Sequence, residues 1–226
     1  PSIDPLEQKE KFKDKIAQYL VGRGFTEILT NSITNSAYFS EEILATSVKM
    51  LNNLTAELDV MRPSMLETGL ETIAYNLNRQ NNSISFFEIG KVYGKSNAGK
   101  YYESEQLAIF LSGKQSVDGW RTKGVDQDYF VAKGTAIALL ELLGITGVQE
   151  KTASYGMTEL VWNKKTIGHV EVMGTKKLQA FGIKQGVQYI QFDVAGILNA
   201  YQSKKVVYKE VSKYPSIERD LALVID

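Results

Sequence analysis

The sequence contains no cysteine and a single histidine, His169. Without thiols the chain forms neither disulfides nor thiolate metal sites, and this composition fits a reducing compartment. One histidine also excludes a metal centre built from several histidines of the same chain. The chemistry of the protein therefore has to come from other residue types.

The sequence also lacks an excess of charge of either sign and any long apolar run. Lysine plus arginine and aspartate plus glutamate number 26 each, so no overall field draws the chain to nucleic acid or to a membrane surface. No apolar run approaches the roughly 20 residues that span a bilayer, and the N-terminus is unlike a signal peptide. We therefore expect no membrane association, and any contact with RNA to be local.

The chain is long enough for a substantial core, since 43% of its 226 residues are hydrophobic. It opens at Pro1 without an initiator methionine and closes with the apolar run Leu221–Ile225. We expect such a sequence to be a piece of a longer polypeptide.

The first predicted element is an amphipathic helix. Asp4, Pro5 and Glu7 have the spacing of a capped helix start, and Gly22 and Gly24 mark its end. Its apolar stripe consists of Phe12, Ile16, Tyr19 and Leu20. The next residues, 25–33, are predicted to form a strand.

The remaining pattern mixes hairpins with separate helices. A helix is expected from Ser64, with Glu67 completing a capping box, and another over Tyr129–Leu143. Further strands and helices are expected at Ile84–Tyr93, Leu107–Leu111, Leu160–Trp162, Ile167–Val172, Lys176–Phe181, Tyr189–Phe192 and Asp193–Ala200. This order predicts an α+β fold, in which helices flank an antiparallel sheet.

Several segments together resemble the class II aminoacyl-tRNA synthetases, and within them the family of phenylalanine–tRNA ligase β subunits. In chain order they are RPSMLETGLETIAYNLNR (62–79), SISFFEIGKVYG (83–94), TIGHVEV (166–172), YIQFDVAGIL (189–198) and SKYPSIERDLALVID (212–226). The resemblance implies a class II synthetase-like catalytic fold over residues 1–205. Residues 206–226 would then be a linker and the truncated first strand of a ferredoxin-like anticodon-binding domain.

The departures from the class II pattern indicate that this domain is catalytically silent. Active members end the first strand of motif 2 with an arginine, whose planar guanidinium binds carboxylate and phosphate through paired hydrogen bonds. Gly94 stands at that position, and the glycine-rich motif 3 with its arginine is missing around 192–196. Asn31 replaces the usual proline of motif 1. We therefore predict no catalytic, cofactor-binding or metal-binding residue in this domain.

The resemblance implies that the domain supports an enzyme rather than being one. Its partners would be the catalytic α subunit and a second αβ pair, forming an (αβ)₂ ligase in the cytoplasm. That enzyme joins phenylalanine to tRNA(Phe) using ATP and Mg²⁺. Two alternatives are a domain that still adenylates an amino acid, and a free-standing RNA-binding or regulatory module. The absent arginines argue against the first and the neutral net charge against the second.

Two surfaces are candidates for interactions. The stripe of Phe12, Ile16, Tyr19 and Leu20 covers either the chain's own sheet or another subunit, and periodicity does not choose between them. The resemblance favours the subunit interface, because motif 1 helices of class II synthetases lie at one. The second surface is a basic stretch that is either a solvated linker or a contact to tRNA phosphates; it consists of Lys204, Lys205, Lys209 and Lys213.

Other polar residues have simpler explanations. Glu88, Glu103 and Glu105 could suggest a Mg²⁺ site, but strand alternation and surface charge explain their spacing better. Asp126 and Asp128 are expected to cap the following helix. His169 lies in a predicted hairpin strand, and we interpret it as structural.

Overall fold

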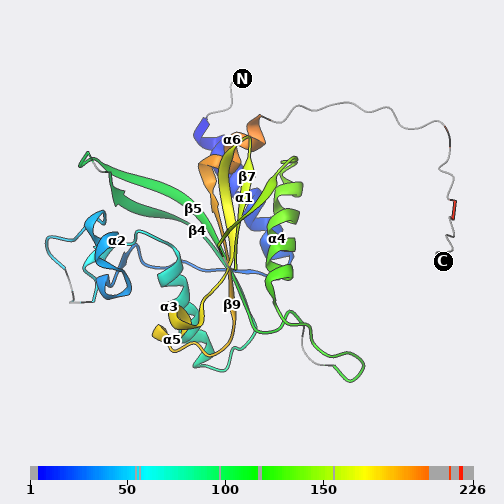
Figure 1. The fold of residues 1–226 in the computed structure, drawn as a ribbon, viewed down its shortest axis with the longest axis horizontal. Coiled ribbons are helices and arrows are strands. Elements are labelled where there is room, and N and C mark those ends of the chain that lie inside the picture. Colours follow the sequence, from blue (N-terminus) through cyan, green and yellow to red (C-terminus); the bar gives the residue numbers. More distant parts are fainter. Residues whose placement is uncertain are drawn as a thin grey trace, which may run out of the picture.

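In a computed structural model of the chain, a seven-stranded sheet forms the centre of the molecule (Figure 1). The structure describes residues 5–53, 55, 57–96, 98–116, 119–154, 156–203, 214 and 219–220. In spatial order its strands are β1 (Thr26–Glu27), β4 (Ile84–Lys95), β5 (Tyr101–Ser112), β9 (Val187–Asp193), β8 (Lys165–Val172), β7 (Met157–Trp162) and β6 (Gln149–Ser154). β1 runs parallel to β4, and every other neighbouring pair is antiparallel. The predicted α+β architecture is confirmed.

Three helices cover one face of this sheet. They are α1 (Pro5–Gly22), α4 (Tyr129–Leu142) and α6 (Val194–Gln202). Because side chains alternate along a strand, Phe87, Ile109 and Ile190 all point to this face and pack in one apolar cluster with the three helices. Asp128 and Asp193 accept hydrogen bonds from the first turns of α4 and α6, so the predicted capping role of Asp128 is confirmed.

The opposite face is covered by α3 (Leu66–Leu77) and α5 (Thr175–Ala180). The alternate strand residues point here, among them Phe86, Phe110 and Tyr189. The two helices cover part of the face, so its apolar residues gather beneath them. The same face also carries the polar residues of the candidate site.

A small second layer lies beside β4. It contains β2 (Ile33–Thr34), η1 (Ser36–Tyr38), α2 (Glu41–Ala45) and β3 (Val60–Met61). β2 and β3 pair with one another in a separate two-stranded sheet. The single strand predicted for residues 25–33 is therefore wrong: its start joins the main sheet as β1, and its end joins the small sheet as β2.

The apolar stripe of α1 faces the chain's own core. Phe12 is 3% exposed, and Ile16 and Leu20 are fully buried in the cluster under α1. Side chains without exposed surface cannot meet a partner, so the interface prediction is corrected for these three. Tyr19 is partly buried at the edge of the cluster, and its hydroxyl accepts a hydrogen bond from Arg23 at 2.9 Å. For Tyr19 the interface assignment stays a prediction.

Glu67 shows a second difference from the sequence analysis. Ser64 accepts a hydrogen bond from Leu66 N at 3.0 Å, as a helix start requires. Glu67 does not complete a capping box, because it is buried and paired with Lys177 of α5. Glu67 thus makes a contact between two helices in place of the expected contact with the start of its own helix.

The C-terminal predictions lie outside the described residues. Lys204, Lys205, Lys209 and Lys213 are among these positions, as is the run Leu221–Ile225. The domain boundary at 205/206, the phosphate contact and the N-cap at Asp4 therefore stay predictions.

Substitutions at two glycines test how tightly α3 packs on the sheet. A Cβ added to Gly69 of α3 would stand 2.0 Å from the Phe110 ring, whereas a Cβ at Gly134 of α4 meets nothing within 4 Å. We predict that Gly69→Ala lowers the free energy of unfolding by about 1–3 kcal/mol through overpacking. Gly134→Ala, the matched control, should raise it by about 0.5–1 kcal/mol, since alanine favours a helix. Urea denaturation measures both, and a neutral Gly69→Ala would contradict the described packing.

Candidate functional site

Buried charged groups mark the candidate site, on the sheet face under α3. Arg62, which follows β3, is 2% exposed, and Glu88 of β4 is 1% exposed. Charged side chains are rarely buried unless they are paired, because removing a charge from water is costly. The burial of both residues therefore marks them as candidates for a structural or functional role.

Arg62 and Glu88 form an ion pair with further polar partners. Arg62 Nη1 lies 2.9 Å from Glu88 Oε1, and its Nε donates to Lys91 O at 2.8 Å. Thr30, which follows β1, accepts from Arg62 Nη1 at 2.6 Å and donates to Glu88 Oε2 at 2.7 Å. The pair thus joins β4, the segment before α3 and the segment after β1.

Gly90 of β4 provides the room for this guanidinium. A Cβ at Gly90 would stand 2.2 Å from Arg62 Nη2 and 2.8 Å from Met65 Cε. Any larger residue would displace the arginine from Glu88. The glycine of the FEIG segment therefore serves packing, and the arginine of the RPS segment fills the space above the strand.

A second buried carboxylate lies beside the first pair. Glu67 Oε1 accepts from Lys177 Nζ at 2.5 Å, while Glu67 Oε2 has no hydrogen-bond partner among the described residues. Burial, and then the nearby charge of Glu67, raise the pKa of Tyr189 well above its usual value. Tyr189 is therefore a neutral hydrogen-bond donor at any physiological pH.

A chain of neutral polar groups crosses the strands next to Tyr189. Its hydroxyl donates to Gln191 Oε1 at 2.7 Å, Gln191 Nε2 donates to Gln106 Oε1 at 3.3 Å, and Gln106 Nε2 donates to Ser104 at 2.9 Å. His169 packs edge-on against the Tyr189 ring with centroids 5.8 Å apart. Burial lowers the pKa of His169, so the imidazole is neutral at pH 7, which supports its interpretation as structural.

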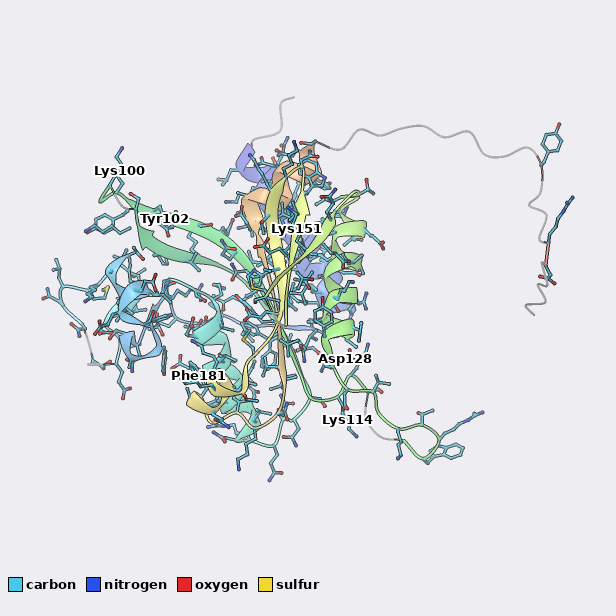
Figure 2. All side chains as sticks on the ribbon, viewed as in Figure 1. Lys100, Tyr102, Lys114, Asp128, Lys151 and Phe181 are labelled. Carbon is cyan, nitrogen blue, oxygen red and sulfur yellow. The ribbon has the colours of Figure 1, made fainter. Side chains whose placement is uncertain are left out.

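Gly94, which the resemblance predicts to replace a motif 2 arginine, lies on the same strand face, nearer the hairpin end. It pairs with Tyr102 of β5, and Figure 2 shows Tyr102 close to the outer end of the β4–β5 hairpin. A Cβ at Gly94 would stand 2.4 Å from the Tyr102 hydroxyl oxygen. The tyrosine ring therefore occupies the space into which a longer side chain at residue 94 would extend.

The remaining carboxylates of the sequence analysis each have cationic partners. Glu103 pairs with Lys91 at 2.7 Å, and Glu105 with Lys9 and Lys13 at 2.8 and 3.1 Å. Burial opposes ionisation of Glu105, but the hydrogen bonds from both lysines hold its pKa below the usual value. Glu88 pairs elsewhere, with Arg62. The three carboxylates thus do not converge on one point.

A shallow groove lies beneath the hairpin. It has a volume of about 420 Å³ and is lined largely by apolar and aromatic side chains, among them Met61, Tyr93, Tyr101 and Tyr102. Its charged lining residue is the carboxylate Glu103. Such a lining suits an apolar side chain and disfavours a phosphate.

The chemistry available on this sheet face is limited by these contacts. Transfer of a nucleotidyl group requires cations that face the ligand and stay fixed there. The arginine of this face is bound to Glu88, Thr30 and a backbone carbonyl and is shielded from solvent. Among the described residues, no three histidine, aspartate or glutamate side chains are placed to hold a metal ion.

The ion pair of Arg62 and Glu88 is not predicted by the sequence, although two features of the sequence point to these residues. Glu88 interrupts the otherwise apolar run from Phe86 to Ile89, and Arg62 precedes a proline shortly before a helix. Their pairing spans 26 residues of sequence. Local patterns do not carry that information.

The sequence was compared with protein families and with curated proteins. Residues 1–194 match the family model described as the phenylalanyl tRNA synthetase beta chain CLM domain. The phenylalanine–tRNA ligase beta subunit of Bacteroides thetaiotaomicron is 32% identical over 238 residues, covering 97% of this chain and 29% of that protein. The beta subunit of Thermotoga maritima is 26% identical over 225 residues, covering 96% and 28%. The chain thus spans less than a third of the length of these relatives.

Solved structures support the fold independently. Pyrrolysyl-tRNA synthetase from Desulfitobacterium hafniense superposes with a TM-score of 0.68 at 18% identity, covering 86% of this chain and 70% of that one. At this identity the likeness concerns the fold alone, which is that of a class II synthetase. No helix among the described residues is long and apolar enough to cross a membrane. On the family match over residues 1–194, the chain belongs to the family of phenylalanyl-tRNA synthetase β-chain CLM domains.

Proposed function

We propose that this chain is the catalytically silent structural core of a phenylalanine–tRNA ligase β subunit. In this proposal it supports a catalytic α subunit within a cytoplasmic (αβ)₂ enzyme, which uses ATP and Mg²⁺ to charge tRNA(Phe). Residues 206–226 would begin the anticodon-binding domain, with the lysines from Lys204 to Lys213 near the tRNA. The relatives are phenylalanine–tRNA ligase beta subunits, which supports the identity of the subunit.

One observation carries the proposed absence of catalysis. The side chain that would bind a phosphate is absent at Gly94, and the Tyr102 ring lies over that position. Arg62, the arginine buried on this face, is neutralised by Glu88. Because neither position offers a guanidinium to a ligand, the negative charge that develops during adenylation would have no fixed cation here.

The partner surface follows from the side chains that α1 and β1 leave exposed. Val21 of α1 is 55% exposed, and Leu29, just after β1, is 93% exposed. β1 is the edge strand of the main sheet and pairs with β4 on one side. Apolar side chains beside an unpaired strand edge favour burial against another chain. We infer that the α subunit covers this edge.

Pyrophosphate exchange tests the proposed absence of catalysis directly. The purified chain should show no phenylalanine-dependent exchange of pyrophosphate into ATP, because Gly94 and the buried Arg62 leave the phosphates without a cation. Adding an intact α subunit supplies the positive control. Exchange by the chain alone, abolished by Arg62→Met or another substitution within this domain, would show that the domain is an active adenylating enzyme.

Co-purification tests the proposed partner surface. Val21→Asp and Leu29→Asp should each prevent co-purification with the α subunit, because a charge without a partner would be buried at the contact. The matched control is Leu51→Asp, since Leu51 is 98% exposed in the segment between α2 and β3. Circular dichroism should give unchanged melting for all three variants. Normal assembly of both edge variants would place the α subunit elsewhere.

A further inference from the structure

The segment between β5 and α4 presents an exposed tryptophan. Trp120 is 97% exposed, and a turn forms around it, in which Gly119 N donates to Thr122 O at 2.9 Å. Figure 1 shows that this segment projects away from the sheet. Tryptophan is among the most apolar side chains and is largely covered in most proteins. We call residues 119–123 the Trp120 turn.

The base of the segment is firmly held. Gln127 is 5% exposed, and its Nε2 lies within 3.1–3.2 Å of the carbonyl oxygens of Ile84, Ser112 and Lys114. Its Oε1 accepts from the Ser85 hydroxyl at 3.1 Å. This buried amide fastens both arms of the segment to the end of the β4–β5 hairpin, so the Trp120 turn starts from a fixed base.

The Trp120 turn is also locally basic. Arg121 and Lys123 are exposed, and neither has an ion-pair partner in the part of the chain that the structure describes. The sequence of the turn, GWRTK, contains no acidic residue. An exposed aromatic ring is thus followed in the sequence by two cations that have no ion-pair partner among the described residues, in a chain with no net charge overall.

This combination fits RNA better than a protein partner. A stable protein interface buries about 800 Å² on each side around an apolar centre, whereas glycine, threonine and two cations surround Trp120. An unpaired base needs one flat aromatic face, and its flanking phosphates need nearby cations. We propose that the Trp120 turn binds an unpaired stretch of RNA, with a base stacked on Trp120 and phosphates on Arg121 and Lys123.

The identity of the RNA rests on the proposed function, under which the assembly handles tRNA. The proposed stacking and charge contacts are independent of that function, because they follow from the exposed side chains of Trp120, Arg121 and Lys123. Binding of RNA and assembly with the α subunit are therefore separate measurements on the same protein.

The test uses fluorescence anisotropy of a labelled single-stranded oligonucleotide of adenosines and uridines, titrated with the chain. Trp120→Ala should weaken binding about tenfold, as expected for loss of one stacked base. Arg121→Ala combined with Lys123→Ala should weaken binding and flatten its dependence on salt. The matched controls are Tyr101→Ala, an aromatic residue 72% exposed on β5, and Lys151→Ala with Lys184→Ala, two exposed lysines elsewhere. Both should bind like the unaltered chain.

Three results would overturn the proposal. The first is that neither the oligonucleotide nor a tRNA(Phe) transcript binds, and the second is that Trp120→Ala binds them like the unaltered chain. If Trp120→Ala instead abolishes co-purification with the α subunit while RNA binding persists, the turn docks a protein. A chain that binds RNA through Trp120 but never joins an α subunit would contradict the proposed function and leave this inference standing.

Discussion

The buried ion pair of Arg62 and Glu88 is the interaction on which the arrangement of this domain depends. Both side chains are nearly inaccessible to water, with Nη1 and Oε1 2.9 Å apart. Burying such a pair costs several kcal/mol for each ion, which good geometry and extra hydrogen bonds offset. Thr30 and the carbonyl of Lys91 supply those bonds. The pair therefore fixes three distant segments in a single geometry.

The same pair supports the proposal that this domain has a synthetase fold without synthetase chemistry. In an active site of this class, a guanidinium must remain available to a phosphate. Here the guanidinium satisfies a carboxylate of its own chain, while Gly94 beneath Tyr102 offers no replacement. Internal contacts thus occupy the arginine on this sheet face, as the proposed structural role requires.

The sequence predicted the elements whose information is local. Apolar residues at helical spacing predicted α1 and α3. The apolar patterns of residues 84–93 and 107–111 predicted the strands β4 and β5. β6 was missed because all six of its residues are exposed and show no apolar alternation. Residues 25–33 were predicted as one strand because a strand's local pattern does not reveal that Thr30, Asn31 and Ser32 form a bend between two sheets.

The candidate site was less accessible to prediction, because it consists of contacts between distant residues. Periodicity showed that Phe12, Ile16 and Leu20 are buried but not that their own sheet covers them. Glu67 has the spacing of a helix cap, yet the energy of its pairing with Lys177 decides its position. Gly94 lies in β4 opposite Tyr102, whose contact with it became apparent only in three dimensions, and its assignment to the motif 2 arginine position stays a prediction.

The most direct test of this account is the stability of Arg62→Met, measured by urea denaturation. If the pair is structural, the substitution leaves the buried Glu88 without its cation and lowers the free energy of unfolding by about 3–5 kcal/mol. Arg79→Met, at an exposed arginine on the end of α3, should change it by less than about 0.5 kcal/mol. Residues retained for binding often reduce stability, so their removal stabilises a protein. An Arg62→Met chain as stable as the unaltered protein, or more so, would contradict the structural role assigned to this face.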